Sequence, residues 1–383
     1  MRALAIHRFL LRLAFAAVHV FAWVFVFQYF YSLELSVATA LIHTALFYTL
    51  SQAIACLVTP IAARFLRGGV RRLMFLGVLF AAAAFVVLGA ALEGFWPLEY
   101  MGAAIAAFAV CMGFYRALYW IPYEVEISGE TRKRPSVFWE ILIAVSPLVA
   151  GLLIASAGEI SGWVLYSGAG IVLLSLVPIL SVRDIHERFS WGYRETFTKL
   201  FTIEHRHIAT SSFLEGVSGA ALLFFWPLAV FLIVESSYGM LGIILAFTFL
   251  MAILTRGAVR KALRRLGLAR SRTLDVVFAA SPWLFRIVVG TPFAIMLVDS
   301  YFYTTTPRRL GVDPLVFEQA ADGGSYVDEY TALKEIALAL GRTVISILGV
   351  TTALFMPIPA VFISIFVAAG LCTVAGVLWL RSN

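Results

Sequence analysis

Charged residues are scarce in this chain of 383 residues: they make up 13% of it, whereas hydrophobic residues make up 62%. A water-soluble domain needs a polar surface that so few charges cannot supply, so the composition predicts a protein whose outer surface faces lipid. The net charge is +7, and basic loops of the kind that set the orientation of a membrane protein explain it. We therefore expect no nucleic-acid partner.

Cysteine and histidine are also rare, with three and six copies. Cys56, Cys111 and Cys372 lie in apolar runs without the spacing of metal ligands, and only His205 and His207 lie close together. Neither a metal nor another cofactor is expected. The sequence also lacks a phosphate-binding loop, a G-x-S-x-G elbow and an H-E-x-x-H motif, which argues against ATP-driven transport and against an enzyme.

Long apolar runs, in contrast, are abundant. A helix that crosses a bilayer needs roughly 20 apolar residues, and we assign twelve such helices, two of them short. The first run, Leu13 to Leu33, is too long for the core of a signal peptide. The sequence predicts an all-α membrane protein with transmembrane helices at 9–32, 37–63, 72–92, 98–121, 136–156, 160–181, 208–234, 238–256, 272–287, 290–306, 329–355 and 358–380.

The segment 272–306 must hold two of these helices, although Pro282, Gly290 and Pro292 interrupt it. With a single helix there, the outer side of the membrane would hold four bases: Arg308, Arg309, Lys334 and Arg381. With two helices, the bases gather on the side that holds both termini, and the rule that basic loops stay inside is obeyed. We therefore expect a plasma (inner) membrane protein of bacterial type with both termini in the cytoplasm.

The two halves of the chain are similar. Gly69 and Gly267 occupy corresponding loops 198 residues apart, and Glu140 and Glu335 begin corresponding helices 195 residues apart. A nearly constant offset indicates a parallel duplication of six helices. The predicted domains are a six-helix bundle at 1–182, an amphipathic cytoplasmic linker at 183–206 that rests on anionic lipid, and a second bundle at 207–383.

With twelve helices in two similar halves, the sequence resembles the major facilitator superfamily, which has this plan. The loop after the second helix is similar to that family's G-x-x-x-D-R-x-G-x-R-R signature, with matches at Arg67, Gly69, Arg71 and Arg72. Leu66 stands where the signature has its Asp, and Ala62 where it has its first Gly. The resemblance implies that this loop helps to gate the protein.

The fifth predicted helix carries a second partial match. Pro147 and Gly151 fit the G-P-x-x-G-G motif of the family's proton-coupled antiporters, while Ser146 and Ala150 replace two glycines with other small residues. Small residues allow close helix contact, and proline allows a bend. This similarity implies a gating role for Pro147 and Gly151 and slightly favours efflux.

The resemblance also implies that helices 1, 4, 7 and 10 line a central cavity. One ionisable residue falls in each of them: His19, Arg116, Glu215 and Asp299. The expected substrate-cavity residues are these four together with Tyr115, Tyr119 and Tyr303. A guanidinium beside aromatic rings suits an anionic or aromatic substrate. Alternatively, Arg116 forms a structural ion pair with Glu140.

Three acids are candidates for carrying a coupling proton: Glu215, Asp299 and Glu140. Burial in a low-dielectric cavity favours the neutral form of a carboxyl group, so such an acid can take up and release a proton. The alternatives are a solvated acid near the cytoplasmic mouth and an acid paired permanently with a base. Tyr303, one turn after Asp299, is a possible hydrogen-bond partner. His19 is either a proton shuttle or, more often for such a residue, a packing residue.

Two further bases, Arg286 and Arg342, lie within predicted helices. Arg342 shares one helix face with the acid Glu335, seven residues before it, and we expect each of these two to contact the opposite half and to latch one conformation. Arg286, beside Trp283, either closes the outer mouth or snorkels to the outer interface, and snorkelling is preferred.

The leading hypothesis is a monomeric, proton-coupled secondary transporter that moves a small-molecule substrate across the lipid bilayer by alternating access. Two alternatives are a scaffold or sensor that keeps the fold without transporting, and a lipid translocator. The degraded signature loop motivates the first alternative, and the aromatic content of 14% motivates the second.

Overall fold

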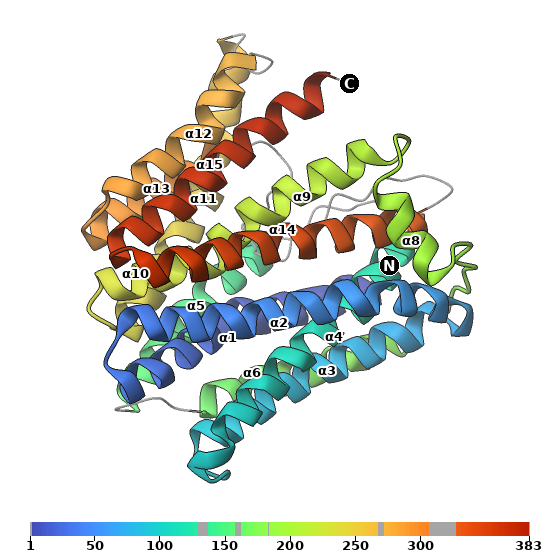
Figure 1. Cartoon of the computed structure of the whole chain (residues 1–383), viewed down its shortest axis with the longest axis horizontal. Coiled ribbons are helices and arrows are strands. Elements are labelled where there is room, and N and C mark those ends of the chain that lie inside the picture. Colours follow the sequence, from blue (N-terminus) through green and yellow to red (C-terminus); the bar gives the residue numbers. More distant parts are fainter. Residues whose placement is uncertain are drawn as a thin grey trace.

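The computed structural model describes residues 2–128, 137–157, 162–182, 184–266, 272–305 and 327–382. Every regular element in these ranges is helical, and no strand occurs among them. Helices satisfy their own backbone hydrogen bonds, as a lipid-facing chain requires. Both the start of α1 and the end of α15 lie toward the same end of the molecule (Figure 1).

The N-terminal half follows the predicted order. Ser36 begins the second helix by accepting a hydrogen bond from the backbone N–H of Thr39, an ordinary N-cap. The sixth helix is divided ahead of Pro178, whose missing N–H cannot bond to the preceding turn. The elements are α1 (Arg2–Glu34), α2 (Val37–Arg64), η1 (Phe65–Gly68), α3 (Val70–Leu92), η2 (Leu98–Tyr100), α4 (Met101–Ser128), α5 (Val137–Ser156), α6 (Trp163–Leu174) and α7 (Leu176–Ile179).

One predicted helix of the C-terminal half contains a local irregularity. The helix expected at 208–234 spans Arg206–Ile233, and a π turn within it, Ala221–Phe225, lies just before Pro227. The proline supplies no N–H, which favours a local widening of the helix. The elements are α8 (Tyr193–Leu200), α9 (Arg206–Ala220), η3 (Ala221–Phe225), α10 (Trp226–Ile233), α11 (Tyr238–Arg265), α12 (Arg272–Val288), α13 (Pro292–Thr305), α14 (Val327–Phe355) and α15 (Ile358–Ser382).

Residues 272–305 fold as two helices, α12 and α13, as the charge argument required, but neither is among the described helices that are long and apolar enough to cross a membrane. They have 17 and 14 residues and pack against each other. Nine helices of the described residues are long and apolar enough to cross a membrane, and α6 with α7 forms a shorter apolar segment. The predicted fold class, an all-α membrane protein, is confirmed.

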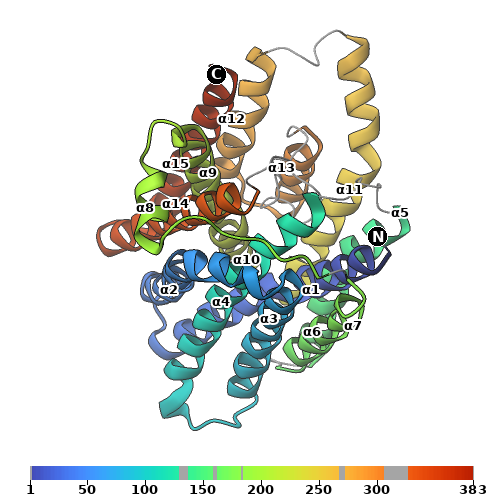
Figure 2. The same cartoon turned by 90° about the vertical axis from the view of Figure 1, so that its right-hand side faces the viewer.

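The two halves meet along two helix pairs, α2 with α14 and α5 with α11. Figure 1 shows α14 lying beside α2, and Figure 2 gives the view along the bundle from the end that holds the termini. In spanning order these pairs are helix 2 with helix 11 and helix 5 with helix 8. Exchanging the halves converts one pair into the other, which is the arrangement that a two-fold relation between duplicated halves produces.

Helix α4 continues past the predicted end at residue 121. It runs to Ser128 and includes Glu124 and Glu126, which are both buried. Sequence hydropathy ends a membrane helix at the first acids, but inside a protein these acids can be accommodated by partners on other helices.

The linker between the halves contains one short helix. Among residues 184–205, which the structure describes, only α8 is helical, and residues 184–190 are irregular. The irregular part is held to the bundle, because Ile185 accepts a hydrogen bond from the N–H of Val70 at 2.9 Å. Ser190 donates to the carboxylate of Glu329 at 2.7 Å. These bonds tie the linker to both halves.

The signature loop closes around an acid from this linker. Gly69 has φ +107, and a Cβ built there would lie 2.5 Å from Oδ1 of Asp184. The same carboxylate accepts from the backbone N–H of Arg71 at 3.1 Å and lies 3.6 Å from its guanidinium. Asp184 therefore supplies next to this loop the negative charge that Leu66 does not.

We expect Gly69→Ala to destabilise the protein by about 1–3 kcal/mol, because a side chain must adopt a strained backbone conformation and displace Asp184. Thermal unfolding of the purified protein in detergent measures the loss. Gly68→Ala is the matched control, since a Cβ at Gly68 has nothing within 4 Å. Equal stability of the two variants would contradict the role given to Gly69.

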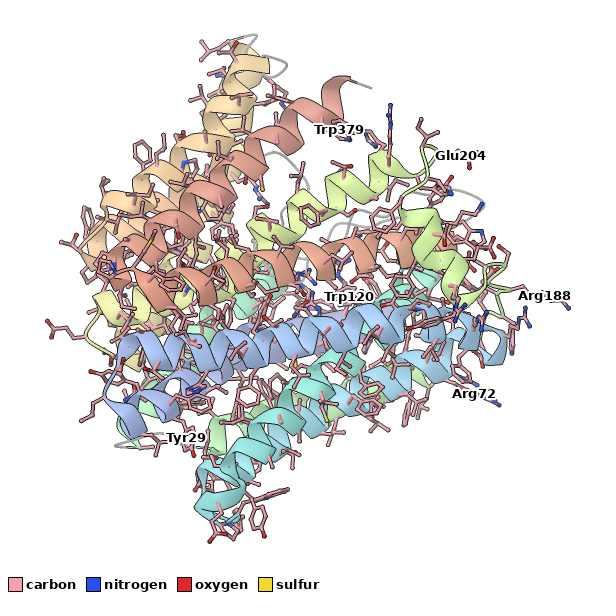
Figure 3. All side chains as sticks on the ribbon, in the orientation of Figure 1. Tyr29, Arg72, Trp120, Arg188, Glu204 and Trp379 are labelled. Atoms are coloured by element: carbon pink, nitrogen blue, oxygen red, sulfur yellow. The ribbon has the colours of Figure 1, made fainter. Side chains whose placement is uncertain are left out.

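Charged residues gather at the end that holds the chain termini. Figure 3 shows Arg72, Arg188 and Glu204 at this end, Tyr29 at the opposite end, and Trp120 inside the bundle. Trp120 is 1% exposed. The separation of polar ends from an apolar middle is what a bilayer imposes on a spanning protein.

Candidate functional site

A small cavity lies between the two halves. Its volume is about 60 Å³, which holds roughly four to six water molecules at 10–15 Å³ each. The wall comes from α1, α2 and α4 of the N-terminal half and from η3, α10, α11 and α13 of the C-terminal half. A cavity walled by both halves is where a rocking transporter places its substrate.

The structure brings together five of the seven residues expected in the cavity. His19, Tyr115, Arg116, Asp299 and Tyr303 all belong to its lining. Tyr119 and Glu215 do not. Tyr119 is buried one turn beyond Tyr115, and Glu215 is half-buried on α9.

Most of the wall is aromatic. Phe15 contacts Tyr115 and His19, with ring centroids 4.9 and 5.6 Å apart. On the opposite wall, Phe249 and Tyr303 meet edge to face at 5.5 Å. Aromatic rings provide large apolar surfaces with a negative face. Such a wall suits a ligand with an apolar body, oriented by a few polar groups.

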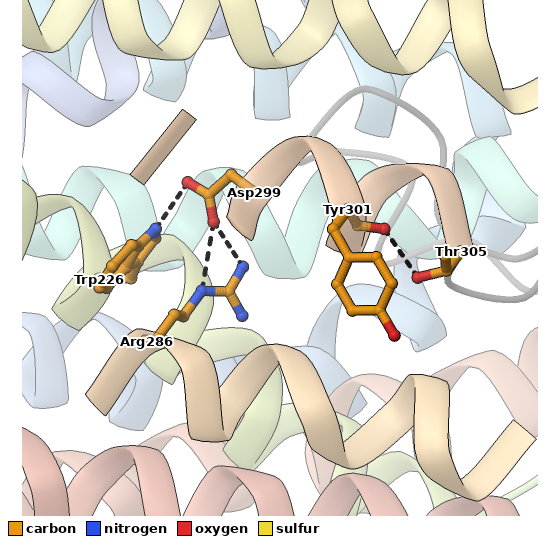
Figure 4. A network of polar contacts seen from close by, with 5 residues as sticks. All are labelled: Trp226, Arg286, Asp299, Tyr301 and Thr305. Atoms are coloured by element: carbon orange, nitrogen blue, oxygen red, sulfur yellow. Dashed lines mark hydrogen bonds and ion pairs between the residues drawn. The ribbon is translucent and has the colours of Figure 1, made fainter. Parts of the chain in front are cut away.

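Asp299 is held in the cavity wall by three hydrogen bonds. One carboxylate oxygen accepts from the indole N–H of Trp226 at 2.8 Å. The other accepts two hydrogen bonds from Arg286, at 2.7 Å from Nη2 and 3.2 Å from Nε. Figure 4 shows this network, with a nearby turn bond from Thr305 to the carbonyl of Tyr301.

Arg286 does not snorkel to the interface, so that preferred interpretation is wrong. Its side chain is 0% exposed, and its guanidinium carbon lies 4.6–5.2 Å from the ring centroids of Trp226, Trp283 and Phe302. A buried guanidinium is stable only with a counter-ion and polarisable neighbours. Asp299 and the three rings supply both.

The partner of Glu140 also differs from the one expected. Glu140 accepts two hydrogen bonds from the guanidinium of Arg12, at 2.9 and 3.0 Å, so it is not the structural counter-ion of Arg116. This two-pronged geometry matches a guanidinium to a carboxylate. Both residues belong to the N-terminal half, α1 and α5, so the pair joins helices within one half.

His7 is a polar residue that the sequence did not single out. It is fully buried, and its Nδ1 donates to the carbonyl of Ser175 at 2.8 Å. In the neutral ring, Nε2 accepts from the hydroxyl of Tyr119 at 2.9 Å. Tyr119 stacks between Tyr115 and Tyr123, with centroids 5.4 Å apart on each side. This tyrosine column leads from the cavity toward the end that holds the termini. Its one sequence signal was the spacing of four residues along α4.

Pro147 and Gly151, two of the residues expected to gate the protein, lie where α5 meets α11 of the other half. A Cβ at Gly151 would lie 3.0 Å from Cα of Gly242, and a Cβ at Gly242 would lie 2.5 Å from the carbonyl of Pro147. On the other pair of helices, Arg342 donates to the side-chain oxygen of Gln52 at 3.4 Å, and Glu335 is buried.

The architecture defines the chain as a multi-pass α-helical membrane protein with the fold of major facilitator superfamily transporters. No protein-family model and no curated protein matches its sequence. Among solved structures, a D-xylose-proton symporter shares the fold with a TM-score of 0.63 and 14% identity, over 99% of this chain and 95% of that one.

Two further solved structures are similar over nearly the whole chain. The peptide transporter POT has a TM-score of 0.58 at 13% identity and covers 99% of this chain and 94% of its own. The E. coli fucose:proton symporter FucP has a TM-score of 0.57 at 14% identity and covers 100% of this chain and 97% of its own. At identities this low, the similarity of the structures shows a common fold alone.

Proposed function

We propose that this protein is a proton-coupled secondary transporter of a small organic anion, working by alternating access. One observation carries the proposal: a cavity between the two halves holds Asp299, whose negative charge is balanced by the buried Arg286. The solved proteins of the same fold are named as transporters, and two of them as proton symporters, which supports coupled transport.

Charge balance links the proton to the solute. When Asp299 takes up a proton, the buried cation Arg286 loses its counter-ion, which is costly in a low-dielectric site. A solute carboxylate in the cavity restores the balance. Proton binding and anion binding therefore favour each other, and this linkage is reciprocal. Arg116 on the opposite wall adds a second cation for an anion to approach.

The two halves, 1–182 and 207–383, are proposed to rock about the cavity, with 183–206 as the connection between them. The end with the termini is proposed to face the cytoplasm, because the basic loops lie there. The efflux preference rested on Pro147 and Gly151 alone, and the named symporters give antiport no support. Direction is therefore left to the transport assay.

The test is transport by the purified protein in liposomes that contain a pH-sensitive dye, with a panel of organic anions, cations, sugars and peptides. We expect an organic anion to dissipate an imposed proton gradient, and Asp299→Asn to abolish this coupling because it cannot bind a proton. Glu215→Gln is the matched control: it removes an acid of the same half that does not line the cavity.

Two outcomes would count against the proposal. If Asp299→Asn keeps full proton-coupled flux, Asp299 does not carry the proton. If no class of solute moves protons through folded wild-type protein, coupled transport is overturned, and the scaffold or lipid-translocator hypothesis replaces it.

A further inference from the structure

Thr248, on α11, contributes a buried hydroxyl to the cavity wall. The residue is 1% exposed, and its Oγ1 has no hydrogen-bond partner among the residues that the structure describes. Two turns later on the same helix, Thr255 donates to the carbonyl of Met251 at 2.6 Å, which is the usual bond of a threonine within a helix. Buried hydroxyls are nearly always paired, so the hydroxyl of Thr248 points to a partner inside the cavity.

The size of the cavity limits a ligand to one ring. The four to six water molecules that its volume holds occupy about 120–180 Å³ of liquid, at about 30 Å³ each, and a cavity of about 150 Å³ binds one benzene molecule. A dipeptide or a disaccharide is larger than this space. The volume therefore favours a compact solute with few substituents on its ring.

The wall favours a flat ring over a saturated one. Both halves of the protein contribute aromatic side chains to it, namely Phe15, Tyr48, Tyr115, Trp226, Phe249 and Tyr303. Aromatic rings pack against one another by stacking or edge to face, and these arrangements stabilise a pair beyond the burial of apolar area. A saturated ring of the same size gains only the burial.

The polar groups of the wall lie on different halves. Arg116, on α4, is a cation that is 8% exposed, and Thr248 belongs to α11 of the other half. Asp299 already accepts three hydrogen bonds, whereas the hydroxyl of Thr248 has capacity to donate and to accept. A ligand with a carboxylate for Arg116 and a hydroxyl for Thr248 would join the two halves across the cavity.

We propose that the transported anion is an aromatic carboxylate with a single ring that carries a hydroxyl, and that Thr248 selects it by hydrogen-bonding this hydroxyl. The ring lies between the aromatic walls of the two halves, and the carboxylate faces Arg116. This assignment rests on the proposed function and names the anion that the function leaves open. A site with a buried group for a substrate hydroxyl rejects the analogue that lacks it, because the buried group then stays unpaired.

The test is the binding of four anions to the purified full-length protein in detergent, measured by titration calorimetry: cyclohexanecarboxylate, benzoate, 3-hydroxybenzoate and 4-hydroxybenzoate. We expect benzoate to bind about two- to tenfold more tightly than cyclohexanecarboxylate, because of its aromatic ring. The better of the two hydroxybenzoates should bind about tenfold more tightly than benzoate, the effect of one added hydrogen bond.

Thr248→Val keeps the branched shape and removes the hydroxyl. In this variant the preference for hydroxybenzoate over benzoate should fall from about tenfold to about one, with benzoate binding unchanged. Thr248→Ser keeps the hydroxyl and should keep most of the preference. Thr255→Val is the matched control, because it removes a hydroxyl of the same helix that does not line the cavity. If Thr248→Val does not fold, Thr248→Ala gives the same ratio, since changes in packing affect both ligands.

Equal binding of benzoate and both hydroxybenzoates by the wild type would overturn the assignment, and so would a preference that survives in Thr248→Val. Equal binding of benzoate and cyclohexanecarboxylate would overturn the aromatic part, and a protein that binds none of the four overturns all of it. The two proposals fail separately. Hydroxybenzoate binding that depends on Thr248 but drives no proton flux contradicts transport, and proton-coupled flux of other anions alone contradicts the substrate class.

Discussion

Arg286→Met is expected to destabilise the protein by about 3–5 kcal/mol, the usual result of removing one partner of a buried ion pair. Methionine fills much of the same space between Trp226, Trp283 and Phe302, so the loss comes mainly from the charge. Asp299 would be left buried with the single indole N–H of Trp226. Denaturant or thermal unfolding in detergent measures the change.

A double-mutant cycle separates charge from packing. Asp299→Asn alone leaves Arg286 buried without a counter-ion and should also be strongly destabilising. The variant with both substitutions leaves no uncompensated charge, so it should be more stable than either single variant. If the losses of unfolding free energy in the two single variants add up to the loss in the double variant, the ion pair of Arg286 and Asp299 does not stabilise the protein as its geometry indicates.

The second large effect is expected at the crossing of α5 and α11. Gly242→Ala places a Cβ 2.5 Å from the carbonyl oxygen of Pro147, which backbone atoms do not tolerate, so the helices must move apart. Overpacking of this kind costs about 1–3 kcal/mol. The cost falls only on the conformation in which the two helices touch, so the variant should favour the opposite conformation and lose most of its transport.

Gly239→Ala is the control for this prediction. It lies one turn away on the same helix, and its Cβ would meet the nearest atom at 3.5 Å, an ordinary contact. Alanine is the better helix former, so this variant should be as stable as the wild type or slightly more stable. The shift between conformations is measured with Thr248→Cys, in the cavity wall, by its rate of labelling with a water-soluble maleimide. Equal labelling rates in the two alanine variants would contradict the role of the crossing.

Much of the helix order could be predicted because spanning helices are long apolar runs. The second helix was expected at 37–63 and is Val37–Arg64. Local breaks were missed, because hydropathy says nothing about hydrogen-bond pattern: Ala221–Phe225 is as apolar as its neighbours and yet forms a π turn. The linker was missed for a different reason. Its conformation depends on contacts with distant residues, such as that of Ser190 with Glu329.

The sequence predicted most of the residues that line the cavity, but it did not predict which side chains pair with one another. His19, Arg116 and Asp299 were found because ionisable side chains are rare in apolar helices and turn away from lipid. Their partners depend on how helices pack, which one sequence does not contain, and so Arg286 was assigned to the interface.

Glu124 was overlooked because it follows the last apolar residue of its run. Only the structure shows that α4 continues through it.

The linker bonds determine where the chain divides into modules. Asp184 and Ile185 hold to the N-terminal half through Arg71 and Val70, whereas Ser190 holds to Glu329 of the other half. Between them, residues 186–188 are exposed. A break in the covalent chain there would leave each half with an anchoring contact of its own, so we expect a chain cut at these three exposed residues to keep both halves folded.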